Sequence, residues 1–456
     1  MAGIGFELRK LLRKETLFGD IQAMLYSVTV FSGPWLFTCF CLAFLGVYFA
    51  NVLDTYQQLM FRATVVYCYA FSMVFTGPVQ MVTTRFLADK YFVGDAKANT
   101  PAFITSLALT LPIQAITAMW FLSMVNETLG YKILALLLYL VISAIWLTMV
   151  PLSAAKDYNS IIAAFFIGCG LSLVAATSLG YRLGLNGLLA GFLVGQLVIL
   201  FALIMRLLVE FELTNAFNKE LIFYFKDKWT LAVTGFFLNL GIWVDKFIFW
   251  YSKEAMEINA PLYSYPLYET ATFLAYVAIV PAMGYFLIKV EVEFYDRYRN
   301  FFEMILHRQP LDTIRGVKLK MATTLREGTR TILLVQGLVT GAALYLSPHI
   351  LQLLNLPGLY LGVVRISMIG ALLLGLFLLD VLILFYFDLQ KEVLAASVFF
   401  CVANAVCTHL SIRLGFPFYG YGFTVASLAS LILVAVLLEW GLRNFEYHTF
   451  TKLPVS

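Results

Sequence analysis

The stretch ILALLLYLVISAIWLTMV, residues 133–150, decides the fold because it runs eighteen residues without a charged side chain. A helix crosses a bilayer with about 20 such residues, since the hydrocarbon core is about 30 Å thick. Comparable stretches recur along the whole 456-residue chain. They predict an all-α, polytopic membrane protein with about 12 transmembrane helices, at 23–49, 63–83, 101–125, 132–152, 161–179, 187–210, 229–251, 268–290, 329–347, 361–387, 391–412 and 420–442.

The composition agrees with this class. Hydrophobic residues make up 61% of the chain and charged residues 13%, against about 25% charged residues in soluble domains. The longest stretch between apolar segments, residues 291–328, is too short to bury a core of its own. The net charge of +4 is spread over short loops, so we expect no nucleic-acid partner.

The basic residues predict the orientation. Of the 31 lysines and arginines, 24 lie at the two termini, in the even-numbered gaps between apolar stretches, or at the stretch ends that border those gaps. Basic loops stay on the cytoplasmic side. We therefore expect a multi-pass protein with both termini in the cytoplasm.

The apolar stretches divide into two groups of six. The second stretch of each group contains a proline at a matching place, Pro78 and Pro281, as expected for a fold built from related halves. The sequence predicts two six-helix bundles around a central cavity. The expected segments are an amphipathic cytoplasmic helix 1–22, a first bundle 23–210, a cytoplasmic linker 211–228, a second bundle 229–442 and a cytoplasmic tail 443–456.

The cytoplasmic loop 291–328 alternates charged and aromatic residues, and Pro310 interrupts it. This pattern predicts two short interfacial helices broken near the proline. The loop is either a solvated connector or a docking surface for a cytoplasmic partner. The basic side chains that would face such a partner are Arg297, Arg299, Arg308, Arg315, Lys318 and Lys320.

Three glycines at intervals of four share one face of a helix in the sixth stretch: Gly187, Gly191 and Gly195. Glycine at this spacing lets another backbone approach closely. We expect a helix-packing surface, with a hinge as the alternative.

Charged residues within the apolar stretches are costly and therefore mark functional candidates. Adjacent side chains on a helix point about 100° apart, so Asp245 and Lys246 are not expected to face one partner together. We expect one of them to pair with Glu269 or Arg365 across the cavity; purely structural ion pairs are the alternative. The candidates for the substrate pathway are Asp245, Lys246, Glu269, Arg365, Asp380 and Arg62.

Few cations line the predicted cavity, which disfavours a phosphate-bearing substrate. Tyrosines are abundant, and Tyr265 and Tyr268 join the pathway candidates. Aromatic rings form interface belts in membrane proteins, but they also suit the apolar face of a neutral sugar. Neutral polar residues within the stretches serve either as sugar ligands or as interhelical contacts: Gln80, Gln114, Asn239, Gln336 and Asn404.

No motif for catalysis is present. The sequence lacks a G-x-S-x-G, an H-E-x-x-H and a P-loop, and its four histidines have no metal-ligand spacing. We expect no enzyme, no cofactor and no metal.

The opening MAGIGFELRKLL, residues 1–12, and FSGPW, residues 31–35, resemble the Pel exopolysaccharide transporter family (PelG), which is similar to the polysaccharide flippases of the MOP superfamily. The resemblance implies two six-helix bundles around a cavity. It also implies an inner-membrane protein that passes the Pel chain, an N-acetylhexosamine polymer, to the periplasm for the biofilm matrix. The implied partners are membrane lipids, a cytoplasmic glycosyltransferase and membrane scaffold proteins that include a cyclic-di-GMP receptor.

Three other functions stay open. One is a lipid-linked oligosaccharide flippase, which the sparse cations disfavour. A cation-coupled multidrug antiporter is another, because Asp245 and Asp380 offer membrane-embedded acids. The last is a non-transporting membrane scaffold for a glycosyltransferase complex.

Overall fold

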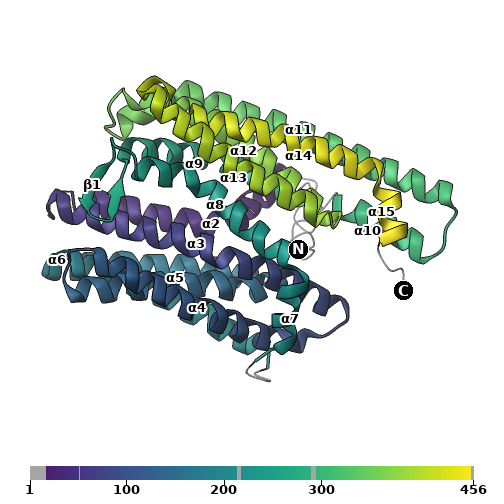
Figure 1. Ribbon diagram of the computed structural model, residues 1–456, viewed down its shortest axis with the longest axis horizontal. Coiled ribbons are helices and arrows are strands. Elements are labelled where there is room, and N and C mark those ends of the chain that lie inside the picture. Colours follow the sequence, from purple (N-terminus) through teal and green to yellow (C-terminus); the bar gives the residue numbers. More distant parts are fainter. Residues whose placement is uncertain (1–16, 51, 213–216, 289–293, 453–456) are drawn as a thin grey trace. The chain divides into compact units, whose positions relative to one another are not determined.

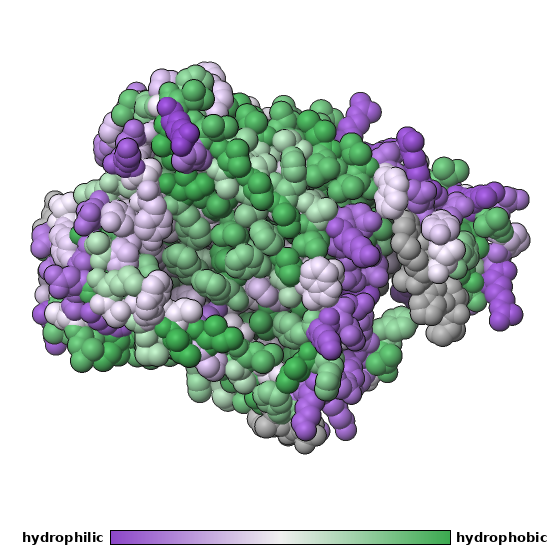
Figure 2. Space-filling model, viewed as in Figure 1, coloured by the Kyte–Doolittle hydropathy of each residue, from purple (hydrophilic) through white to green (hydrophobic). Residues whose placement is uncertain are grey.

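The computed structural model describes residues 17–50, 52–212, 217–288 and 294–452. Ten helices in this part of the chain are long and apolar enough to cross a membrane, and a bent helix adds an eleventh. Each predicted apolar stretch falls on one of these helices, two of them on the same helix, and the helix that contains 329–347 begins 18 residues earlier, at Leu311. Hydrophobic side chains dominate the middle of the face seen in Figure 2, and hydrophilic ones gather toward the helix ends.

The chain forms two compact units. The first unit, Gly33–Tyr265, begins within α2 (Leu17–Tyr48), a helix that bends by 72° between its parts Gln22–Val30 and Ser32–Tyr48. Its other elements are α3 (Thr55–Phe92), the 3-10 helix Ala96–Ala98, α4 (Asn99–Met124), α5 (Leu129–Ala154), α6 (Tyr158–Glu210), α7 (Lys219–Asp227), α8 (Trp229–Trp250), β1 (Met256–Asn259) and β2 (Leu262–Ser264) (Figure 1).

The second unit combines the described residues before Gly33 with those from Pro266 onward. Its elements are the start of α2, then α9 (Pro266–Ile288), α10 (Tyr295–Leu306), α11 (Leu311–Leu353), α12 (Tyr360–Tyr386), α13 (Gln390–Leu414), the 3-10 helix Phe416–Phe418, α14 (Tyr421–Arg443) and α15 (Phe445–Lys452).

The units differ from the predicted six-and-six division in two places. The helix α8 belongs to the first unit because it crosses α3 closely: a Cβ on Gly77 would lie 2.6 Å from the Gly235 carbonyl oxygen. The start of α2 belongs to the second unit, where Gly284 of α9 meets the Val28 backbone. Whether 23–210 and 229–442 act as separate bundles stays a prediction.

The 53-residue helix α6 folds back on itself and supplies two of the predicted spans. The reversal is at Gly184, whose φ of +58° is favourable for glycine. Beyond it, three glycines face the first half of the helix: Gly187, Gly191 and Gly195. A Cβ at these positions would lie only 2.1–2.4 Å from backbone atoms of Leu179, Ala176 and Gly168. The glycines therefore allow two helical segments to pack backbone against backbone.

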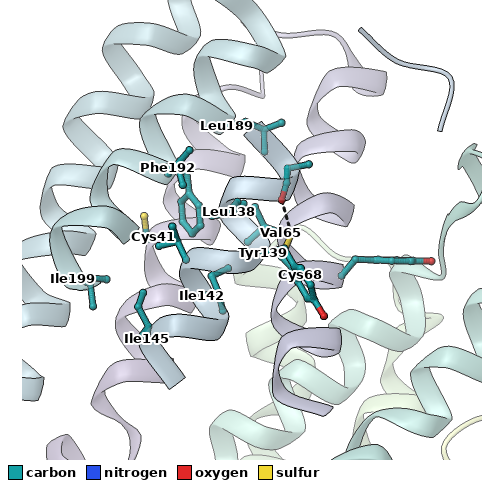
Figure 3. Close-up of a cluster of buried hydrophobic side chains, with 14 of the residues drawn as sticks. Cys41, Val65, Cys68, Leu138, Tyr139, Ile142, Ile145, Leu189, Phe192 and Ile199 are labelled. Atoms are coloured by element: carbon teal, nitrogen blue, oxygen red, sulfur yellow. Dashed lines mark hydrogen bonds between the residues drawn. The ribbon is translucent and has the colours of Figure 1, made fainter. Parts of the chain in front are cut away.

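The core of the first unit lies where α3, α5 and α6 meet. Phe192 of α6 packs with Leu138 and Ile142 of α5 and with Val65 of α3 in one buried cluster (Figure 3). The Cys68 thiol in the same cluster donates to the carbonyl oxygen of Ala135 at 3.8 Å. This apolar contact area fixes α3, which carries most of the site described below.

The linker between the halves of the chain contains α7, which docks on the end of α3. Glu220 forms an ion pair with Lys90, and the Tyr224 hydroxyl donates to the Asp89 carboxylate. Burial of the phenol and this carboxylate raise the pKa of Tyr224 above its ordinary value. The predicted amphipathic helix 1–22, in contrast, lies mostly outside the described residues.

The loop 291–328 departs from the prediction. Its first helix, α10, ends before Pro310 as expected, but the second is the beginning of the 43-residue α11 and not a separate short helix. No proline follows until Pro348, so helix propagates directly into the membrane span. At about 1.5 Å per residue, α11 is roughly 64 Å long and extends beyond a bilayer.

Buried aromatic rings pack α10 and α15 against each other and against the residue that ends α12, and α10 also packs against α11 (Figure 1). Phe445 of α15 lies 5.0 Å from Phe301 of α10 and 4.7 Å from Phe387, measured between ring centroids. Glu446 of α15 accepts from Arg315 and Lys318 of α11. The three helices therefore present a packed surface.

A short β-hairpin, absent from the prediction, connects α8 to α9. The antiparallel strands β1 and β2 enclose the turn at Pro261. Asn259 fastens the hairpin to the rest of the first unit, because its amide exchanges hydrogen bonds with the Asn126 backbone and donates to the Tyr56 hydroxyl at 2.9 Å. Tyr56 in turn donates to Glu127 at 2.7 Å.

Candidate functional site

The helices α3 and α8 pack against each other and contain most of the first unit's candidate residues. Their shared contact is called the α3–α8 wall below. Two pairs of rings stack across it. Tyr67 and Trp250 lie 4.2 Å apart with planes 11° from parallel, and Phe71 and Phe247 lie 5.0 Å apart at 10°. Offset-stacked rings are a favoured aromatic geometry. Farther along the two helices, the glycine contact described above takes the place of the rings.

Two of the predicted intramembrane charges pair with each other. Lys246 Nζ donates to both carboxylate oxygens of Asp245, at 3.1 and 3.0 Å, and to the Ile242 carbonyl oxygen at 3.0 Å. Asp245 is fully buried and Lys246 is 5% exposed. The flexible lysine stem bends back along its own helix to the neighbouring carboxylate, a pairing that the sequence did not predict. Pairing with Glu269 or Arg365 stays a prediction.

The other charged candidates are spread over both units. Arg62 is half-buried on α3 in the first unit. In the second unit, Arg365 is exposed and donates to the Ser347 hydroxyl at 3.1 Å, and Glu269 lies in the first turn of α9. Asp380 of α12 is only 5% exposed, and among the described residues its carboxylate has no hydrogen bond or ion pair.

The two tyrosine candidates differ in their surroundings. Tyr265, at the end of the first unit, lies 5.2 Å from the ring of Phe249 and is half-buried. Tyr268, in the first turn of α9, is fully buried. Tyr268 therefore contributes to packing in this conformation.

Most neutral polar side chains within the spans form hydrogen bonds. The amide of Asn239 donates to the Gly235 carbonyl oxygen, and that of Gln80 donates to Thr76. Gln336 donates to the Ala278 carbonyl oxygen and to Thr340, and Asn404 accepts from Thr408. Gln114 differs: it is 2% exposed, and neither its amide oxygen nor its nitrogen has a hydrogen-bond partner in the described part of the chain.

The predicted partner-facing residues separate into two groups. Arg299 pairs with Glu303 at 2.7 Å, and Arg315 and Lys318 share Glu446 at 3.4 and 3.3 Å. The other three are exposed and form no ion pair within the described residues: Arg297, Arg308 and Lys320. These three cations therefore have no counter-charge within hydrogen-bond distance in the described part of the chain.

The sequence prediction missed Trp243, Asn259 and Tyr56. The hairpin that contains Asn259 had a signal in the turn Asn259-Ala260-Pro261, since Asn and Pro mark turns. Trp243 had no such signal, because a tryptophan in an apolar span cannot be distinguished from other packing residues.

The α3–α8 wall of the first unit thus combines stacked aromatic rings, neutral polar side chains and an ion pair between neighbouring residues. Its described side chains present mainly apolar and neutral polar groups.

The fold is that of transporters of the MOP superfamily. An outward-facing multidrug resistance MATE family transporter of that superfamily aligns with a TM-score of 0.64 at 12% identity, over 92% of this chain and 96% of its own. The inward-facing form of such a transporter aligns with a TM-score of 0.62 at 13% identity, over 94% of this chain and 100% of its own. A MOP superfamily transporter from Pyrococcus furiosus aligns with a TM-score of 0.64 at 12% identity, over 94% of this chain and 96% of its own. It is described as having a binding pocket of reverse polarity.

The chain itself belongs to the PelG family, whose model is described as a putative exopolysaccharide exporter (EPS-E) and matches residues 1–450. The resemblance of the N-terminal residues to this family is thereby confirmed. No curated protein matches the sequence.

Proposed function

We propose that this protein passes the Pel polysaccharide, an N-acetylhexosamine polymer, across the bacterial inner membrane to the periplasm. The observation that carries the proposal is the neutral, aromatic wall of α3 and α8 in a member of an exopolysaccharide exporter family. Sugar rings present apolar C–H faces to aromatic rings and hydroxyl groups to neutral hydrogen-bonding side chains. An anionic cargo would instead favour unpaired arginines and lysines, and Lys246 is paired within its own helix.

We also propose that a cytoplasmic glycosyltransferase hands the polymer over, together with membrane scaffold proteins that include a cyclic-di-GMP receptor. Support for a docking surface comes from the packed assembly of α10, α15 and the start of α11. Its exposed cations Arg297, Arg308 and Lys320 are available to acidic side chains of a partner. This assignment places both termini in the cytoplasm.

Asp380 supports a second candidate function, which is ion-coupled transport. A cation-coupled multidrug antiporter of the same superfamily would be one example of it. A buried carboxylate without a hydrogen bond or ion pair among the described residues is expensive when charged. Such a group takes up a proton or another cation readily. Ion coupling and polymer export are compatible, because the ion gradient would drive the movement.

Both ideas are tested by measuring polymer export while the synthase remains active. Asp245→Asn, Lys246→Met, Glu269→Gln and Arg365→Gln are compared with Asp227→Asn, which changes an exposed carboxylate of α7. We expect reduced export from variants that alter the pathway and unchanged export from the control. Full export from all four would show that these charges do not serve the pathway. Export by the wild type and by Asp380→Asn, each measured with and without an ionophore, tests ion coupling. Export that is unchanged by the substitution and by the ionophore would rule ion coupling out.

A further inference from the structure

Some buried polar atoms of the first unit have no hydrogen-bond partner among the described residues, and two side chains lack a partner at every polar atom they have. They are the amide of Gln114 on α4 and the indole of Trp243 on α8. Leaving a buried donor or acceptor unpaired costs about 1–3 kcal/mol. Proteins retain few such groups, and each one calls for a physical reason.

The position of Trp243 follows from its neighbours on α8. One turn toward the end of the helix, Phe247 stacks on Phe71 of α3. One turn the other way, the Asn239 amide lies 2.3 Å from where a Cβ of Gly77 would be. Trp243 therefore lies opposite the turn of α3 between Phe71 and Gly77.

The position of Gln114 on α4 follows in the same way. Toward the end of α4, Phe121 lies 6.4 Å from Phe71, measured between ring centroids. Toward its start, Ser106 is hydrogen-bonded to Thr83 at 3.0 Å. Gln114 is about midway between these contacts, so it too lies opposite the middle of α3, from another side.

That part of α3 contains Pro78. Proline has no N–H, so it cannot donate the helical hydrogen bond to the Val74 carbonyl oxygen. Three helices thus bring neutral hydrogen-bonding groups to one level: an amide from α4, an indole N–H from α8 and a main-chain carbonyl from α3. None of these groups is charged.

Aromatic faces adjoin this level. Phe71 and Phe75 stack with centroids 6.3 Å apart, and Trp243 and Phe247 stack at 6.4 Å. Phe75 is 43% exposed. Flat apolar faces beside neutral donors and acceptors match a sugar ring with hydroxyl and acetamido substituents.

We propose that Gln114 and Trp243 form a binding subsite for one neutral N-acetylhexosamine unit at the Pro78 turn of α3. The proposal deepens the proposed function and rests on it for the choice of sugar. Gln114 is buried in this conformation, so the sugar reaches the amide when α3 moves at the proline. The bound sugar would then form the hydrogen bonds that the Gln114 amide and the Trp243 indole N–H lack in this conformation.

The first test separates a ligand-binding amide from a structural one by thermal unfolding of the full-length protein in nanodiscs. Gln114→Leu removes an unpaired amide, so its Tm is expected to equal or exceed that of the wild type. The matched control Gln336→Leu removes an amide that donates to Ala278 and Thr340 and is expected to lower Tm. A fall in Tm for Gln114→Leu as large as for the control would overturn the proposal, since the amide would then already be paired.

The second test measures binding of tetra-N-acetylchitotetraose to the same nanodiscs, with cellotetraose as the probe that lacks acetamido groups. We expect the acetylated probe to bind more tightly. Gln114→Leu and Trp243→Phe, which keeps a ring but loses the N–H, should each weaken it by about 2- to 12-fold, the equivalent of one hydrogen bond.

Equal binding by the wild type and both variants would overturn the subsite. Failure of the proposed function looks different: Pel export in cells would not depend on this protein, while the probe would still bind and the variants would still weaken binding.

Discussion

At the scale of single residues, the buried ion pair of α8 is a costly feature of the molecule. Asp245 is fully buried and Lys246 nearly so, and the lysine satisfies both carboxylate oxygens. Burying two charges is favourable only when their geometry is good and their remaining hydrogen bonds are made. The additional bond from Lys246 to the Ile242 carbonyl oxygen meets part of this requirement.

Removing one partner should therefore cost far more than removing both. We expect Lys246→Met to lower the free energy of unfolding by about 3–5 kcal/mol, because it leaves a buried carboxylate uncompensated. The double variant Asp245→Asn with Lys246→Met should recover most of this loss. The measurement is denaturant or thermal unfolding in nanodiscs, with Lys226→Met on the exposed face of α7 as control. Equal stability of the single and double variants would contradict a stabilising pair.

The presence of these charges could be predicted from the sequence, but their partners could not. A charged residue in an apolar stretch stands out by its cost alone. Its partner depends on how a flexible side chain such as Lys246 bends, which hydropathy does not describe. For the same reason Gln114 was recognisable as polar, while only the structure shows that its amide has no partner among the described residues.

At the scale of elements, the spans follow from length and hydropathy, and the joints between them do not. The prediction separated 161–179 from 187–210, and α6 reverses between these segments at Gly184. In contrast, the start of α11 is polar and gave no sign that it continues into the span at 329–347. The hairpin Met256–Ser264 is too short for a periodic pattern to reveal.

The glycine contact within α6 makes a prediction about this element. Gly191→Ala adds a Cβ at 2.3 Å from the Ala176 backbone, so the two halves of α6 must separate. We expect a loss of about 1–3 kcal/mol, the usual cost of overpacking. Gly170→Ala is the matched control, because no atom lies within 4 Å of a Cβ at that exposed position of the same helix. A Tm of Gly191→Ala equal to that of the control would show that the contact is loose.

At the scale of the whole molecule, the alternation of helices fixes which loops share a side of the membrane. The 22-residue helix α8 is about 33 Å long, enough to cross the bilayer once. We therefore predict that the β-hairpin after it lies on the opposite side from α7. We expect α9 to cross back, which would return α10 and the start of α11 to the side of α7. This alternation is independent of how the helices group into units.

The excess of basic residues on the side of α7 then predicts which side is cytoplasmic. In a variant whose six native cysteines are replaced, a membrane-impermeant maleimide applied to spheroplasts should label Glu257→Cys of the hairpin at once. It should label Lys320→Cys of α11 only after permeabilisation, although both positions are exposed in the structure. The opposite pattern would place α10, α15 and the start of α11 in the periplasm. A surface there could not receive a polymer from a cytoplasmic synthase, so the same experiment decides whether Arg297, Arg308 and Lys320 can serve as its docking site.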